Sequence, residues 1–214
     1  MAVIFDLDGT LLNTLEDIAN SANSVLESHG FPTHEIYEYR NFVGDGINML
    51  ITRVLPQDKQ NDDTIRACVK AFREVYSRNW KVKTKPYDGV AEMLDELSAR
   101  RLKLAVLSNK PDDFTKKCVD GLLPKWNFAI VLGYHSGSLR KPDPTGARQI
   151  AEYLNISPSH ILYLGDSDVD MQTASAAGMF PVGALWGFRS MGELRASGAR
   201  AVIERPQELL TLLG

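Results

Sequence analysis

The chain has 214 residues, of which 44% are hydrophobic and 24% charged, and its formal net charge is −3. This balance is ordinary for a globular protein and gives no strongly basic surface, so we expect no nucleic-acid partner. No run of about 18 apolar residues predicts a membrane span, so we expect no membrane partner. The two cysteines, Cys68 and Cys118, lack metal-like spacing and favour buried thiols. Nothing indicates a signal segment or an oxidising compartment, so the default location is the cytoplasm.

An apolar strand at residues 3–5 runs directly into two aspartates, Asp6 and Asp8, and then into Thr10. A buried strand does not ordinarily end in unpaired carboxylates, because an isolated buried charge is costly to desolvate. We therefore expect a cation, either a divalent metal or a basic side chain, beside these two acids. The Thr10 hydroxyl could hold an anionic oxygen. The alternative interpretation is an ordinary Asx turn with a helix cap at Thr10 or Asn13.

Residues 14–83 predict a run of helices, because apolar side chains recur there at helical spacing. Gly30 and Pro32 end the first of these helices, in the order expected of a helix C-terminus. A turn at residues 43–46 separates the second from the third. The expected helices cover residues 16–29, 34–42, 47–55 and 61–80.

Beyond residue 84, short apolar strands alternate with amphipathic helices, which argues for a parallel sheet with helices on both faces. We expect an α/β fold with a Rossmann-like doubly wound core, residues 1–13 and 84–214, and an inserted helical cap, residues 14–83. Ligands of such sheets bind beyond the carboxyl ends of the strands, where the insert is placed to act as a lid. The segment 180–185 is expected at the sheet edge, because proline suits an edge strand. The expected strands cover 104–108, 128–132, 161–165, 180–185 and 201–203, and the helices 90–97, 114–122, 146–154 and 171–177.

Polar residues follow the predicted strands at their carboxyl ends. Ser108, Asn109 and Lys110 come at the end of the second strand. One interpretation is a helix cap at Ser108 or Asn109, with Pro111 in the first helical turn. The other is a cradle for an anion. The two are compatible, because the open N–H groups of a helix N-terminus bind anions.

Two further polar segments lie at later strand ends. Arg140 and Lys141 stand between a strand and a helix, where they form either a solvated basic turn or a cation for the site. Three acids follow the strand 161–165, and the alternative there is a helix cap at Ser167 or Asp168. Carboxylate oxygens of this kind suit Mg²⁺, which takes few carboxylates and keeps several waters. The three acids are Asp166, Asp168 and Asp170.

These four segments resemble, in order and in position, the four motifs of the haloacid dehalogenase (HAD) superfamily of aspartyl phosphohydrolases. The resemblance covers essentially the whole chain, and the string at residues 3–12 is specific. The segment 141–144 resembles the third motif, which favours Lys141 over Arg140 as the cation. An insert directly after the first motif resembles the helical cap of subclass I.

The resemblance implies a phosphatase in which Asp6 attacks phosphorus and forms an aspartyl-phosphate, while Asp8 serves as general acid and base. Mg²⁺ is implied to bind the Asp6 carboxylate, the Asp8 backbone carbonyl and Asp166. Asp170 is implied to orient the waters of the metal or Lys141. The groups implied to hold the phosphoryl oxygens are Thr10, Ser108, Asn109 and Lys141.

Other classes fit the sequence less well. A haloacid dehalogenase proper works without Mg²⁺ and lacks an acid two residues after its nucleophile, so Asp8 disfavours it. A phosphosugar mutase is disfavoured because the segment 42–47 has no arginine just after its first glycine. A signalling receiver domain is much shorter and has no helical insert. A binding or scaffold protein with a dead site is disfavoured by the complete set of motifs.

The segment 41–50 with Arg53, and the later segment 184–188, resemble phosphoglycolate phosphatases. This implies a small phosphorylated metabolite, most favourably 2-phosphoglycolate, bound by Arg53 and by the backbone amides that begin at Gly44. The alternative interpretation is that residues 44–46 form an ordinary turn, that Arg53 is a solvated helix residue, and that Trp186 is a core aromatic. Pyrophosphate, sugar phosphates and nucleotides remain alternatives, because fold alone does not choose a substrate. We expect a monomer or a small homo-oligomer.

Overall fold

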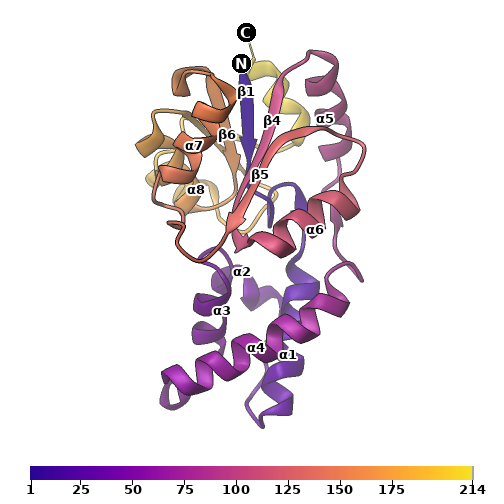
Figure 1. Ribbon diagram of the computed structural model, residues 1–214, viewed down its shortest axis with the longest axis vertical. Helices are drawn as coiled ribbons and strands as arrows, with labels where there is room; N and C mark the ends of the chain where they lie inside the picture. Colours follow the sequence, from indigo (N-terminus) through magenta and orange to yellow (C-terminus); the bar gives the residue numbers. More distant parts are fainter. Residues whose placement is uncertain (214) are drawn as a thin grey trace. The chain divides into compact units, whose positions relative to one another are not determined.

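The computed structural model describes residues 1–213, which form two compact units (Figure 1). The first, called the α/β unit, consists of residues 1–13 and 86–213, and the second, the helical unit, is Thr14–Lys85. The helical unit thus ends at Lys85, whereas the sequence predicted an end at residue 83. The labels of core and cap remain a prediction, and each unit is described by itself.

The α/β unit is built on a six-stranded parallel sheet. Its strands are β1 Ala2–Phe5, β4 Lys103–Pro111, β5 Phe128–Tyr134, β6 Ile161–Gly165, β7 Phe180–Ala184 and β8 Ala201–Ile203. They lie in the order β5-β4-β1-β6-β7-β8, and all neighbours pair in parallel. Phe5 pairs with Val106 of β4 and with Leu164 of β6, so the carboxyl ends of these three strands lie side by side at one end of the sheet, called the sheet edge below. This confirms the predicted doubly wound sheet and marks the edge where ligands bind in this architecture.

Helices cover both faces of this sheet, with α7 and α8 on one side (Figure 1). The α-helices are α5 Val90–Ala99, α6 Asp112–Leu122, α7 Thr145–Leu154, α8 Asp168–Ala177 and α9 Met191–Ala196. Alternate strand residues point to opposite faces, and Ile4 and Tyr163 lie in one buried cluster with Ile150 of α7. Burying a side chain such as Ile4 completely contributes about 1.5–3 kcal/mol. This packing fixes the position of β1 within the sheet.

Strand β4 continues beyond its predicted end at residue 108 and reaches Pro111, which still pairs with Tyr134 of β5. Helix α6 begins only after it, so Ser108 and Asn109 are strand residues and do not cap a helix. The local pattern favoured a cap because polar residues before a proline are typical of a helix start. The partner strand β5, which also runs further than predicted, is what keeps this segment extended.

Strand β7 is not the edge strand that Pro181 led us to expect. Strand β8 pairs with the side of β7 that faces away from β6, so β8 is the edge strand of the sheet. The pairing with β8 begins at Val182, one residue after Pro181. Strand β8 therefore has no paired residue opposite Pro181 that would need the backbone N–H group which proline lacks.

The helical unit agrees with the four helical segments predicted for it. Its α-helices are α1 Leu15–Ser28, α2 Tyr39–Phe42, α3 Ile47–Val54 and α4 Asp62–Asn79. A 3-10 turn at Ile36–Glu38 precedes α2 and accounts for the start of the segment predicted at 34–42. Asn61 caps α4 by accepting a hydrogen bond from the Thr64 N–H at 3.0 Å. Strands β2 Leu12–Asn13 and β3 Lys85–Pro86 form a two-stranded sheet where the chain enters and leaves this unit.

A buried aspartate ties the beginning of the helical unit to its end. Asp17 of α1 is 2% exposed, and its carboxylate accepts hydrogen bonds from two consecutive residues, Lys83 and Thr84. The donors are both N–H groups and the Thr84 hydroxyl, at 2.7–3.0 Å. Because its oxygens are well satisfied, this buried carboxylate holds the two segments together.

Across residues 1–213, no helix has the length and apolar character needed to cross a membrane. Cys68 and Cys118 are both buried thiols, as the sequence predicted. Both thiols therefore act as small apolar side chains in the packing.

Candidate active site

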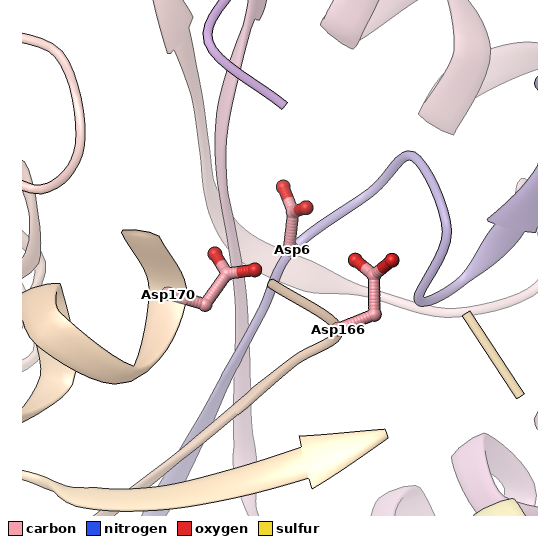
Figure 2. Close-up of side chains that lie close together, drawn as sticks. All are labelled: Asp6, Asp166 and Asp170. Atoms are coloured by element: carbon pink, nitrogen blue, oxygen red, sulfur yellow. The ribbon is translucent and has the colours of Figure 1, made fainter. Parts of the chain in front are cut away.

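Three carboxylates gather at the carboxyl edge of the sheet, as Figure 2 shows. Asp6 follows β1, Asp166 follows β6, and Asp170 lies in the first turn of α8. One oxygen of each lies within 4.8 Å of the others, and all three residues are buried. Like charges in a buried site disfavour one another strongly, so this cluster requires a compensating cation.

Lys141 supplies part of the compensating charge. Its Nζ lies 2.8 Å from Asp6 Oδ1 and 2.6 Å from Asp170 Oδ1, and the residue is 5% exposed. Burial acts to lower the pKa of Lys141, but the charges of Asp170 and Asp6 outweigh it and hold this pKa well above its ordinary value. The neighbouring Arg140 instead lies over the Tyr134 ring, with Cζ 3.8 Å from the ring centre.

One lysine does not neutralise the cluster. Burial raises the pKa of Asp6 to about 7, although Lys141 acts to lower it, and Asp170 adds to the rise. Burial also raises the pKa of Asp166 well above its usual range, with the charges of Asp6 and Asp170 as further causes. Among the described residues, no group has hydrogen-bond geometry to Asp6 Oδ1, although Lys141 lies close to it. A further cation beside Asp6 and Asp166 would therefore stabilise their ionised carboxylates.

Asp170 is oriented by the start of helix α8. Ser167 and Asp170 form a capping box, in which the Ser167 N–H and hydroxyl donate to Asp170 Oδ2 at 3.1 and 2.5 Å. Lys141 Nζ donates to the other oxygen, Oδ1, at 2.6 Å. The cap considered for Ser167 therefore exists, and it also fixes the acid that contacts Lys141.

Asp166 is fixed from two sides. The Thr10 hydroxyl donates to Asp166 Oδ1 at 3.2 Å, and the Phe188 N–H donates to Oδ2 at 2.7 Å. The Trp186 indole N–H donates to the Thr10 carbonyl at 2.9 Å, which joins the turn at 186–188 to the first motif. The Thr10 hydroxyl, which the resemblance assigned to phosphoryl oxygens, is thus bonded to Asp166 in this structure.

Two glycines leave room for Asp166. Gly9 has a φ of +88°, and a Cβ there would lie 2.3 Å from Asp166 Oδ2. A Cβ on Gly187 would lie 2.2 Å from Asp166 Cβ. Neither position accepts a side chain without displacing the aspartate, so both turns depend on glycine.

Asp8 is paired with a lysine that the sequence did not single out. Lys110 Nζ lies 3.0 Å from Asp8 Oδ1 and 3.2 Å from Oδ2, and the two side chains are 5% and 12% exposed. They are 102 positions apart and meet because β1 and β4 are neighbouring strands. The available signal was a lysine directly after Ser108 and Asn109. Only the extension of β4 past residue 108 makes that lysine part of the site.

Ser108 and Asn109 lie at the same edge, and alternate strand residues point in opposite directions. Asn109 pairs with the backbone of Lys141: its Nδ2 donates to the carbonyl at 3.1 Å, and its Oδ1 accepts from the N–H at 2.8 Å. Ser108 Oγ accepts a hydrogen bond from the Lys110 N–H at 3.3 Å. Asn109 thus positions Lys141, a role that the sequence did not suggest.

Gly44 and Arg53, expected to bind the substrate, belong to the helical unit. Arg53 forms an ion pair with Asp45 and donates a hydrogen bond to the Phe42 carbonyl at 3.0 Å. Gly44, with a φ of +129°, lies in the turn 43–46 that these contacts hold. The structure therefore shows Arg53 stabilising this turn, and its contact with substrate stays a prediction.

The charges of the α/β unit fit a divalent cation. Four aspartates stand against two lysines at the sheet edge, which leaves two formal negative charges. The acids are Asp6, Asp8, Asp166 and Asp170, and the lysines are Lys110 and Lys141. Carboxylate oxygens are the hard ligands that cations such as Mg²⁺ prefer. The donor set and the charge balance therefore both suit a divalent metal.

Comparisons with known proteins bear directly on this site. The haloacid dehalogenase-like hydrolases match residues 3–184 of the chain. A phosphoglycolate phosphatase from Aquifex aeolicus is 32% identical over 211 residues, covering 99% of this chain and 95% of the relative. One from Thiobacillus denitrificans is 33% identical over 180 residues, covering 83% and 79%. The crystal structure of a predicted phosphoglycolate phosphatase from Haemophilus somnus has a TM-score of 0.91 at 26% identity, covering 100% and 97%.

The chain therefore belongs to the haloacid dehalogenase-like hydrolases, as its four motifs predicted, and is an enzyme. The matched residues 3–184 include all four motifs of the sheet edge. Within the family, its sequence and its fold are both similar to those of phosphoglycolate phosphatases.

Proposed function

We propose that the protein is a Mg²⁺-dependent phosphatase that hydrolyses a small phosphate monoester, 2-phosphoglycolate, through an aspartyl-phosphate on Asp6. The observation that supports this most is the buried Asp6 carboxylate, which forms an ion pair with Lys141 and lies close to the carboxylates of Asp166 and Asp170. Membership of a hydrolase family supports the reaction class. The relatives' names support the substrate.

In the first step an Asp6 oxygen attacks phosphorus, and the bond from phosphorus to the leaving oxygen breaks. Asp8 donates its proton to that oxygen, so the product leaves as an alcohol. In the second step water attacks the same phosphorus, Asp8 takes up a proton from the water, and the bond from phosphorus to Asp6 breaks. Inorganic phosphate is released, and both aspartates return to their starting states.

The other residues of the sheet edge would hold and neutralise the phosphoryl group. Mg²⁺ would be held by the Asp6 carboxylate, the Asp8 backbone carbonyl and Asp166, and when bound it offsets the phosphoryl charge. Lys141 adds a fixed positive charge, since Asp170 and the Asn109 amide hold it in place. The groups proposed at the phosphoryl oxygens are Thr10, Ser108, Asn109 and Lys141.

Substrate selection is proposed to involve the helical unit, through Arg53 and the backbone amides that begin at Gly44. The support is the resemblance of the segment 41–50 to phosphoglycolate phosphatases. Pyrophosphate, sugar phosphates and nucleotides remain alternative substrates, because relatives with one fold act on different esters.

Phosphate release from a panel of esters tests this proposal, with Mg²⁺ and with excess chelator. The panel contains 2-phosphoglycolate, pyrophosphate, hexose phosphates and nucleotides. Asp6→Asn should abolish release, whereas Asp168→Asn, the same change at an aspartate in the first turn of α8 whose side chain is 46% exposed, should retain it. Release that survives in Asp6→Asn contradicts the aspartyl mechanism, and release from no ester contradicts the phosphatase function.

We also propose a cytoplasmic location, with a small phosphorylated metabolite as the partner and neither nucleic acid nor membrane bound. The net charge of −3 and the two buried cysteine thiols support this. The proposed state, a monomer or small homo-oligomer, is measured by light scattering coupled to size-exclusion chromatography.

A further inference from the structure

The ion pair between Lys110 and Asp8 has no part in the chemistry described so far. Both oxygens of the Asp8 carboxylate face one ammonium group, at 3.0 and 3.2 Å, and the lysine side chain is 5% exposed. A charged lysine is buried at a cost in desolvation, which a partner has to offset. Asp8 is the partner that offsets this cost, and because the pair is shielded from solvent, the attraction between the two charges is strong.

The backbone of Lys110 is held rigidly by its neighbours. Its N–H donates to Ser108 Oγ at 3.3 Å, and its carbonyl accepts from Thr115 Oγ1 at 3.1 Å. Pro111, the next residue, is paired with Tyr134 at the end of the sheet. The backbone of Lys110 is therefore fixed, and the burial of its side chain, which is 5% exposed, keeps the ammonium group against Asp8.

We propose that Lys110 is a positioning residue for Asp8: it holds the carboxylate in the orientation from which a proton passes to the leaving oxygen and, later, is taken from water. The inference rests on the proposed function, in which Asp8 is the general acid and base. Contact with both oxygens holds the Asp8 carboxylate in one place beside Lys110 Nζ, and proton transfer requires a defined geometry.

The reaction itself offers a way to isolate this role. The alkoxide of an alkyl ester such as 2-phosphoglycolate is a poor leaving group and depends on protonation by Asp8. The leaving groups of p-nitrophenyl phosphate and acetyl phosphate depart without it. The constant kcat/KM covers the steps up to formation of the aspartyl-phosphate, whereas kcat also includes its hydrolysis. A misplaced Asp8 therefore affects kcat/KM for alkyl esters and the second step for all esters.

The test is Lys110→Met, compared with Asp8→Asn and with Lys103→Met, the same change at an exposed lysine at the start of β4. For 2-phosphoglycolate, or the fastest alkyl ester of the panel, we expect kcat/KM to fall on the order of 10²-fold. For the two activated esters we expect kcat/KM to change less than about 3-fold, well below an acid–base contribution. Product release from them should show a rapid burst followed by slow turnover, because the aspartyl-phosphate accumulates. Lys103→Met should behave as the wild type, and Lys110→Arg should recover part of the loss.

Equal losses on alkyl and activated esters without a burst, or no loss on either, would overturn the proposal. Thermal unfolding of each variant separates misfolding from misplacement, and Lys110→Gln replaces Lys110→Met if the latter does not fold. Failure of the proposed function is a different result: wild-type protein would then release phosphate from no ester, activated or not.

Discussion

The α/β unit and the helical unit use their charged side chains in different ways. At the carboxyl ends of the strands, Asp166, Asp170 and Lys141 are 5% exposed or less. Lys141 forms an ion pair with Asp170, and the carboxylates of Asp166 and Asp170 have oxygens within 4.8 Å of each other. In the helical unit, the side chains of Arg53 and Asp45 are 31% and 32% exposed and form a pair beside a turn. Buried charges interact strongly, whereas half-exposed pairs are screened by water. We therefore expect changes to the buried charges at the carboxyl ends of the strands to have large effects, and loss of the Arg53–Asp45 pair to have a small effect on stability.

The largest effect is expected where the charge balance of the sheet edge is broken. Lys141→Met removes the cation that contacts Asp6 and Asp170, so activity should fall by roughly 10²- to 10³-fold, as for a lost electrostatic contact to the reacting group. Initial rates with saturating Mg²⁺ measure this. Lys116→Met is the matched control, because Lys116 is an exposed lysine paired with Asp112 on α6. A rate within a few-fold of wild type in Lys141→Met contradicts the assignment.

The second largest effect is expected where the chain packs closely around Asp166. Gly187→Ala places a Cβ 2.2 Å from Asp166 Cβ, so the aspartate or the 186–188 turn has to move. We expect the affinity for Mg²⁺ to fall by about 10- to 100-fold, the size usual for groups that orient a metal ligand. Titration calorimetry with Mg²⁺ measures the affinity directly. In Gly192→Ala the added Cβ meets only Ser190 Oγ, at 3.9 Å, so this variant should bind Mg²⁺ like the wild type.

The third prediction concerns pH and metal together. In the metal-free fold the pKa of Asp6 is raised to about 7, so the folded state keeps a proton that the unfolded state loses near its ordinary pKa of 3.8. The stability that this proton provides is present at low pH and is lost as pH rises through about 7. Mg²⁺ stabilises the ionised carboxylates, so its addition should raise Tm more at about pH 8 than at about pH 5.

Differential scanning fluorimetry with and without Mg²⁺ measures this pH dependence. At a Mg²⁺ concentration of about 100 times Kd, the gain is roughly 2.7 kcal/mol, which is several degrees for a chain of this size. Asp6→Asn lacks the titrating group, and its gain should vary less with pH. An equal gain for the wild type at both pH values would contradict the role of Asp6 as a ligand.

The smallest effect on stability is expected in the helical unit. Arg53→Met breaks the partly exposed pair with Asp45, so the free energy of unfolding should change by at most about 1 kcal/mol. If Arg53 binds the acidic group of the substrate, this variant should raise KM for 2-phosphoglycolate and leave kcat nearly unchanged. Asp45→Asn frees the arginine and should not raise KM. A rise of KM in both variants would instead mean that Arg53 acts only by holding the turn.

Most of the fold follows from local sequence patterns. Helical spacing of apolar residues located α1 and α4 to within one or two residues, because burial of one face and capping by Asn61 are local properties. Short apolar runs located β1, β5 and β6 for a similar reason. The ends of elements were less predictable. Strand β4 runs past Ser108 because β5 is beside it, and no local pattern carries that information.

The candidate site divides in the same way. The sequence indicated Asp6, Asp166 and Lys141, because acids and a lysine at strand ends are unusual and match the motifs of one family. It also indicated Ser167 as a helix cap, which the structure shows bonded to Asp170. It did not indicate that the Thr10 hydroxyl bonds to Asp166, that the Asn109 amide pairs with the Lys141 backbone, or that Lys110 meets Asp8.

The sequence by itself determined the family, the parallel α/β architecture with its helical insert, and the acids and lysine at the strand ends. These depend on periodicity and on short motifs, which are local. Only the tertiary structure decided the strand order, the interior place of β7, and the pairing of Asp8 with Lys110, 102 positions away. Contacts of that separation depend on which strands become neighbours. That choice is made by the packing of the whole sheet, because no single segment contains the partner that it will meet.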